Sequence, residues 1–145
     1  MPNAKFKVEA RSDSNARVLV KARNFDLIID EPENLGGDDR GANPVEFVLA
    51  ALAGCLNVVG NLIAKEMDFK ISNLKFEIEG ELNPMKFLGK SSAERAGYQN
   101  ITAVVSGDTD ADEKTIEEWL SRVEERCPVS DNLQNPTPVN IELKK

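Results

Sequence analysis

Short stretches in which hydrophobic and polar residues alternate open the chain. Segments 4–9, 17–21 and 24–29 alternate or are rich in β-branched and aromatic side chains, a pattern typical of β-strands. Turn-forming residues at 12–15 separate the first two segments. We therefore expect an N-terminal antiparallel meander, followed by a loop over 31–42 that is rich in glycine and aspartate and contains Pro32.

The strongest pattern is a nearly continuous hydrophobic stretch from Pro44 to Lys65. Asn43 suits the N-cap, Pro44 the first helical position, and Glu46 lies where the acid of a capping box belongs. Residues 47–56 are all apolar or glycine, which predicts a helix buried on all sides. Such a helix of 22 residues spans roughly 33 Å, whereas a domain of this size has a radius of gyration of roughly 15 Å. A second subunit is therefore expected to cover part of it.

The second half of the chain alternates between strand and helix patterns. We expect strands over 74–82 and 98–106, and a last strand that contains Val139, Ile141 and Leu143. Residues 85–97 form a long irregular stretch between the first two, which makes this loop a candidate lid. Residues 112–126 predict a helix with an apolar stripe, and Cys127 continues the stripe at its end.

Length and charge limit the classes of function. The 145 residues suit a single domain over 1–145, and a net charge of −7 disfavours nucleic acid and anionic membrane surfaces as partners. The N-terminus lacks the pattern of a secretory signal, so we expect a cytoplasmic protein whose thiols are reduced at rest. A membrane span is disfavoured because the uninterrupted apolar stretch has only ten residues and Asn57 and Asn61 follow it.

The candidate chemistry rests on two cysteines in a sequence without histidine. Cys55 lies within the hydrophobic helix and Cys127 stands directly before Pro128, 72 positions later (127 − 55 = 72). This spacing does not fit a redox CxxC motif, and two cysteines are too few for a four-ligand zinc site. The lack of histidine excludes Ser-His-Asp and Cys-His catalysis, and neither GxxxxGK[ST] nor GxGxxG occurs. We therefore expect no metal and no cofactor.

A reactive Cys55 needs a neighbouring group that stabilises its thiolate, because an ordinary thiol is mostly protonated at neutral pH and burial makes it less acidic. Without histidine the helper must be Arg or Lys, and candidates lie in strands or loops at Arg11, Arg17, Arg23, Arg40 and Arg95. Arg40 is close to the helix start, but Cys55 lies over three turns further on, which disfavours Arg40 within one subunit. Cys127 ends a helix, where negative charge is disfavoured, so a resolving role suits it better than attack. The alternative is that both thiols are small buried hydrophobes and that Glu46 is only a cap.

Two segments carry a resemblance to a known family. Residues 41–55, GANPVEFVLAALAGC, and residues 127–133, CPVSDNL, resemble the OsmC/Ohr family, and the order of strands and helices agrees over most of the chain. The resemblance implies an α+β, OsmC-like fold with antiparallel sheets packed around a long buried central helix. It also implies an intertwined homodimer with a site at the interface.

Peroxidase-type members of this family reduce organic hydroperoxides without metal or flavin. Carried over, Cys55 is the peroxidatic thiolate, Cys127 the resolving thiol, and an external dithiol the reductant. Those members have glutamate directly after Asn-Pro, where this chain has Val45 and Glu46 follows about 100° further around the helix. This departure favours the broader OsmC-like branch. The activating arginine stays open among Arg17, Arg23 and Arg40, and Glu46 remains a candidate acid.

Two other hypotheses remain beside the peroxidase. One is a non-catalytic module that binds a small apolar or thiol-bearing ligand in the interface cavity. The other is an inert dimeric partner, which two deeply buried and widely separated thiols would favour. The separation of the two sulfur atoms discriminates between chemistry and packing.

Overall fold

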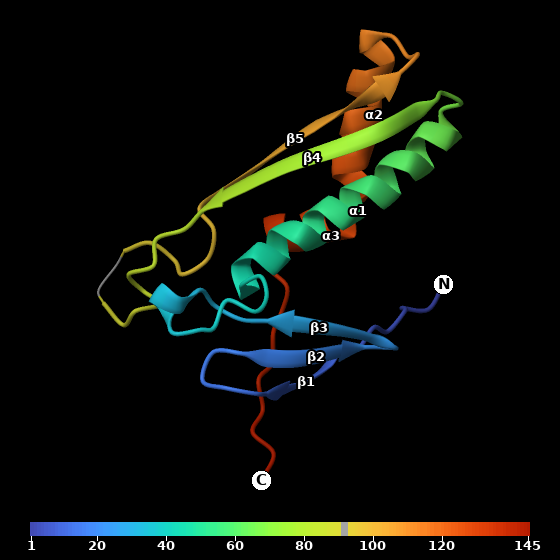
Figure 1. Cartoon of the computed structure of the whole chain (residues 1–145). Helices are drawn as coiled ribbons and strands as arrows, with labels where there is room; N and C mark the ends of the chain where they lie inside the picture. Colours follow the sequence, from blue (N-terminus) through green and yellow to red (C-terminus); the bar gives the residue numbers. More distant parts are fainter. Residues whose placement is uncertain (91–92) are drawn as a thin grey trace. The chain divides into compact units, whose positions relative to one another are not determined.

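A computed structural model describes residues 1–90 and 93–145 of the chain (Figure 1). The chain forms two compact units, Met1–Val48 and Leu49–Lys145. The expected lid over 85–97 includes residues 91–92, which lie outside the described residues.

The first unit contains a three-stranded antiparallel sheet in the order β1-β2-β3, which confirms the predicted meander. Its strands are β1 (Glu9–Ser12), β2 (Val18–Ala22) and β3 (Phe25–Ile29), and a short 3-10 helix, η1 (Glu33–Leu35), follows. The expectation of a first strand over 4–9 was wrong: pairing begins only at Glu9, opposite Lys21. Phe6 and Val8 are 94% and 61% exposed, so this apolar segment has neither a pairing strand nor a core in the described chain.

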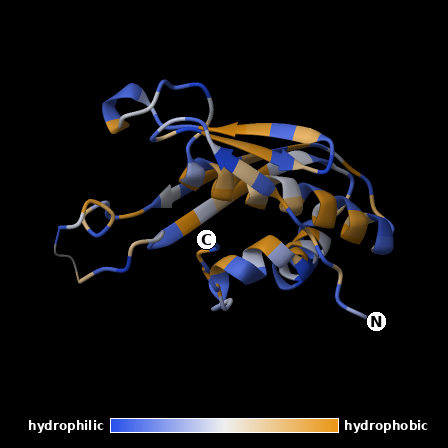
Figure 2. Cartoon of the chain, turned by 90° about the horizontal axis from the view of Figure 1, so that it is seen from below, coloured by the Kyte–Doolittle hydropathy of each residue, from blue (hydrophilic) through white to orange (hydrophobic). Residues whose placement is uncertain are grey.

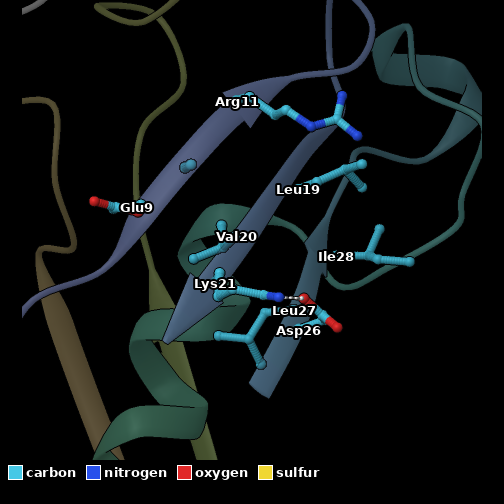
Figure 3. A pocket seen from close by; sticks show the side chains of 9 residues that line it. Glu9, Arg11, Leu19, Val20, Lys21, Asp26, Leu27 and Ile28 are labelled. Carbon is cyan, nitrogen blue, oxygen red and sulfur yellow. Dashed lines mark ion pairs between the residues drawn. The ribbon is translucent and has the colours of Figure 1, made fainter. Parts of the chain in front are cut away.

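A groove of about 580 Å³ lies over this small sheet and is lined by residues of its three strands (Figure 3). The strand register places Arg11, Leu19 and Ile28 side by side on one face. Lys21 pairs with Asp26 across the neighbouring strands at 3.6 Å. The groove contains neither cysteine.

The central helix is α1 (Pro44–Glu66). Its start is the predicted capping box, because the Asn43 amide donates to Glu46 and the Glu46 amide donates to the Asn43 side chain, both at 2.9 Å. The expectation of burial on all sides was wrong within one chain: Val58 and Leu62 are 66% and 47% exposed. α1 is long and apolar enough to cross a membrane, a test that core helices of soluble proteins also pass.

The second unit pairs two long antiparallel strands, β4 (Ile71–Glu81) and β5 (Asn100–Thr109). Helix α2 (Glu113–Arg126) follows, capped by Asp112, and then a short helix, α3 (Pro128–Gln134). Hydrophobic and hydrophilic residues alternate along the strands (Figure 2), and the inward set packs on a core formed by α1 and α2. The buried residues of that core are Leu52, Leu56, Val59, Ile63, Ala64, Trp119, Val123 and Cys127.

The C-terminal segment differs from the prediction. No strand forms over 139–143, and Val139, Ile141 and Leu143 are 77%, 92% and 84% exposed. An alternating sequence forms a strand only where another strand supplies hydrogen bonds, and none pairs with this segment in the described chain. Helix α3, which the sequence analysis did not anticipate, begins at Pro128 directly after α2.

Candidate active site

The two cysteines lie together in the second unit. Cys127 Sγ donates a hydrogen bond to Cys55 Sγ at 3.0 Å, although 72 positions separate the residues in the chain. Both thiols are free in this structure. A disulfide has an S–S length of about 2.05 Å, so bond formation needs a movement of about 1 Å. The prediction that the fold brings the two sulfurs side by side is confirmed.

The two thiols differ in exposure. Cys127 is fully buried at 0% exposure in the core of its own chain, as the apolar stripe of α2 predicted. Cys55 projects from α1 at the edge of that core and is only partly buried. An approaching molecule therefore meets Cys55 first.

Backbone amides at the start of α3 contact both sulfurs. The Ser130 amide donates to Cys127 Sγ at 3.4 Å, and the Val129 amide donates to Cys55. Cys127 is at once the last cap of α2 and the N-cap of α3. The expectation that a helix end makes the surroundings of Cys127 unfavourable for negative charge was therefore incomplete. The new helix turns N–H donors toward the sulfur.

The surroundings of Cys55 favour the neutral thiol. Burial raises the pKa of Cys55, the bond shared with Cys127 raises it further, and the Val129 amide lowers it. Among the described residues, no Arg or Lys makes a hydrogen bond to either sulfur within the second unit. The contacts of Cys55 within this unit are thus the Cys127 sulfur and the Val129 amide.

The position of Cys127 depends on how α2 packs on α1. The indole Nε1 of Trp119 donates to the Gly60 carbonyl at 2.8 Å, and its ring stands edge-on to Phe69, with centroids 6.2 Å apart. A Cβ at Gly60 would lie 3.0 Å from the Trp119 ring, so only glycine allows this approach without a shift. Arg126, next to Cys127, makes a bidentate pair with Glu66 at the end of α1, with N–O distances of 2.6 and 3.0 Å.

Among the predicted arginines of the first unit, Arg17 has the most extensive contacts. It bonds Asp13 at 2.7 Å and Asp38 at 2.8 Å, and it lies 3.7 Å from Asp30. Asp30 is fully buried. Burial alone would raise the pKa of Asp30, but the amides of residues 31, 40 and 38, together with Arg17, lower it below its usual value. These contacts hold the loop after β3 in place.

The other predicted residues have simpler surroundings. Arg23 is exposed in the turn between β2 and β3, with its guanidinium 5.0 Å above the Phe25 ring, and Arg40 is exposed on the loop before α1. Arg11 lies 3.9 Å from Asp13. Glu46 makes the capping hydrogen bond described above, and Arg95 donates to the Tyr98 carbonyl in the second unit.

Sequence reasoning missed the two backbone donors at residues 129 and 130. Their signal was present, because proline directly after a capping residue is typical of the first position of a helix.

Comparison with known proteins identifies the family of this chain. The family model for OsmC-like protein matches residues 36–142, a range that contains both cysteines. The chain belongs to the OsmC family. No curated protein matches the sequence.

Solved structures of OsmC proteins share the fold. An OsmC-like protein from Mycoplasma pneumoniae is 21% identical, with a TM-score of 0.79 over 92% of this chain and 89% of the other. The organic hydroperoxide resistance protein OhrB of Bacillus subtilis is 23% identical, with a TM-score of 0.62 over 97% and 98%. A protein described as an organic hydroperoxide resistance protein, from Elizabethkingia anophelis, is 17% identical, with a TM-score of 0.64 over 90% and 88%. The predicted α+β, OsmC-like fold is thereby confirmed.

Proposed function

We propose that this OsmC protein reduces organic hydroperoxides with its thiol pair, Cys55 as the attacking and Cys127 as the resolving residue. The observation that carries the proposal is the 3.0 Å separation of the two sulfurs, one partly exposed and the other fully buried. The names of the Bacillus and Elizabethkingia proteins support the substrate class.

The chemistry proceeds in three balanced steps. The Cys55 thiolate attacks the outer oxygen of the hydroperoxide, the O–O bond breaks, and with one proton an alcohol leaves while Cys55 becomes a sulfenic acid. The Cys127 thiol then displaces water from the sulfenic acid and a disulfide forms. An external dithiol restores both thiols and becomes a disulfide itself.

The thiolate needs a cation, and Arg17, Arg23 and Arg40 are the proposed sources. Each belongs to the first unit or, through dimerisation, to a second copy of it. The three stay unranked: Asp13 and Asp38 hold the guanidinium of Arg17, that of Arg23 lies over the Phe25 ring, and Arg40 is exposed. Replacement of each arginine by methionine in turn assigns the role: the activating one lowers the rate of hydroperoxide consumption and raises the pH at which Cys55 is alkylated.

A homodimer is part of the proposal. One face of α1 exposes Val58 and Leu62, and the C-terminal segment exposes Val139, Ile141 and Leu143. A second subunit that covers these side chains removes them from water. Light scattering should give twice the mass of one chain, and Val58→Glu should shift the protein toward the monomer whereas Val58→Ala does not.

Cumene hydroperoxide and dithiothreitol test the activity directly. We expect Cys55→Ser to abolish consumption of the hydroperoxide. Cys127→Ser should slow turnover, because dithiothreitol must then reduce the sulfenic acid directly, and should form no intramolecular disulfide. Wild-type protein treated with the hydroperoxide alone should lose about two daltons in mass, which corresponds to the two thiol hydrogens. Equal rates in the wild type and both variants would refute the proposal.

A second candidate function, a binding module without turnover, is favoured by the raised pKa of Cys55 and by Val45 in the family's glutamate position. Such a module would retain a small apolar or thiol-bearing ligand. The pH dependence of the rate at which iodoacetamide alkylates wild-type Cys55 discriminates between the peroxidase and the binding module. A rate profile with its midpoint near neutral pH indicates an activated thiolate. A midpoint above the ordinary pKa range of cysteine indicates the module.

A further inference from the structure

We infer that, once the pair is oxidised, the external thiol attacks the sulfur of Cys55, and Cys127 is the leaving group. This inference rests on the proposed function, because it concerns the step that returns the disulfide to two thiols. The proximity of the two sulfurs does not by itself say which one the external thiol attacks and which one leaves.

Access to the two sulfurs is unequal within one chain. Cys127 is 0% exposed, and its neighbours in the core include Leu56 and Val123. Since this burial comes from its own subunit, a second subunit cannot remove it. The sulfurs are already 3.0 Å apart, so the small movement that forms the bond leaves Cys127 in the core.

The direction of attack strengthens the argument. In thiol–disulfide exchange the attacking sulfur approaches in line with the S–S bond, from the side opposite the leaving sulfur. Attack on Cys127 would require an approach through the core behind it, where α2 and α3 meet. Attack on Cys55 avoids that path, because Cys55 lies at the edge of the core and is only partly buried by its own subunit.

The structure also provides for the leaving group. When the S–S bond breaks, its electron pair goes to Cys127 Sγ, which the Ser130 amide contacts at 3.4 Å. A thiolate that accepts an N–H bond is a better leaving group, because the bond stabilises its charge. The reductant forms a mixed disulfide with Cys55, and its second thiol then displaces Cys55 as a thiolate. The two protons released by the dithiol restore the two protein thiols.

The test uses wild-type protein oxidised with diamide, so it does not depend on peroxide turnover. A mass loss of about two daltons confirms the disulfide. The oxidised protein is mixed with the monothiol 2-mercaptoethanol, quenched in acid with urea and N-ethylmaleimide, and the two cysteine peptides are analysed by mass spectrometry. We expect the mercaptoethanol adduct on Cys55 and the maleimide on Cys127. An adduct mainly on Cys127, or no disulfide after diamide, would overturn the inference.

Single-cysteine variants provide the matched control. DTNB should react with Cys55 in Cys127→Ser about tenfold or more faster than with Cys127 in Cys55→Ser, because access contributes to the exchange rate. In urea the two variants should react at similar rates. Equal rates in the folded variants would contradict the inference. Loss of peroxide turnover with the adduct still on Cys55 would instead count against the proposed function alone.

Discussion

The contact between Trp119 and Gly60 allows a quantitative test of the packing that positions Cys127. Trp119→Phe removes the hydrogen bond to the Gly60 carbonyl, worth about 0.5–1.5 kcal/mol. The smaller ring also buries roughly 40 Å² less apolar surface, which costs about 1 kcal/mol. We expect the free energy of unfolding to fall by about 1.5–2.5 kcal/mol, which lowers Tm by about 3–10 °C.

Gly60→Ala in both backgrounds makes the test specific. Alanine in a helix stabilises by about 1 kcal/mol over glycine, but its Cβ would lie 3.0 Å from the Trp119 ring, and overpacking costs about 1–3 kcal/mol. We therefore expect Gly60→Ala to be neutral or destabilising in the wild type. Once phenylalanine removes the close ring atoms, the same change should stabilise by about 1 kcal/mol.

Urea unfolding followed by circular dichroism at one protein concentration measures all four proteins. Fluorescence cannot serve, because Trp119 is the chain's single tryptophan. The expected coupling between the two changes is about 1–3 kcal/mol. If Gly60→Ala has the same effect in both backgrounds, the close approach of α2 to α1 does not limit the packing, and the reasoning fails.

Three further predictions concern the first unit and the start of α1. Glu46→Gln should keep both stability and hydroperoxide turnover if Glu46 is only a cap, since glutamine also completes a capping box; lost turnover with retained stability would make it a catalytic acid. Asn43→Ala should lower the free energy of unfolding by about 1 kcal/mol in urea melts, and an unchanged melt would exclude the cap. The pKa of Asp30 is lower in the folded chain than its ordinary 3.8, so its stabilisation is complete above that value and is lost as pH falls through the folded pKa. Urea melts between pH 3 and 6 should therefore show a weaker pH dependence for Asp30→Asn, and equal slopes would contradict the assignment.

The elements with strong internal patterns were predictable from the sequence. Asn43, Pro44 and Glu46 form the predicted capping box, and the apolar stripe of α2 buries Trp119, Val123 and Cys127 as expected. These features depend on neighbours three or four positions away, which the sequence displays directly. The proximity of Cys55 and Cys127 also followed, but from the family resemblance.

Features that depend on distant partners could not be predicted. The 139–143 segment alternates like a strand but has no strand to pair with in the described chain. The exposed face of α1 carries Val58 and Leu62 beside Asn57 and Asn61, so composition alone could not tell that Val58 is exposed within one chain. Arg17 contacts Asp13, Asp30 and Asp38, which lie in separate parts of the sequence. No local sequence pattern predicts these contacts.

Cys127 is both the C-cap of α2 and the N-cap of α3. A change at its sulfur therefore also changes a hydrogen bond of the backbone. A change in the charge or bonding of this sulfur alters the strength of the hydrogen bond that it accepts from the Ser130 amide. The exchange of that single amide proton with solvent therefore reports the oxidation state of the pair. In 15N-labelled protein, the Ser130 amide resonance would follow the redox cycle without a substrate analogue.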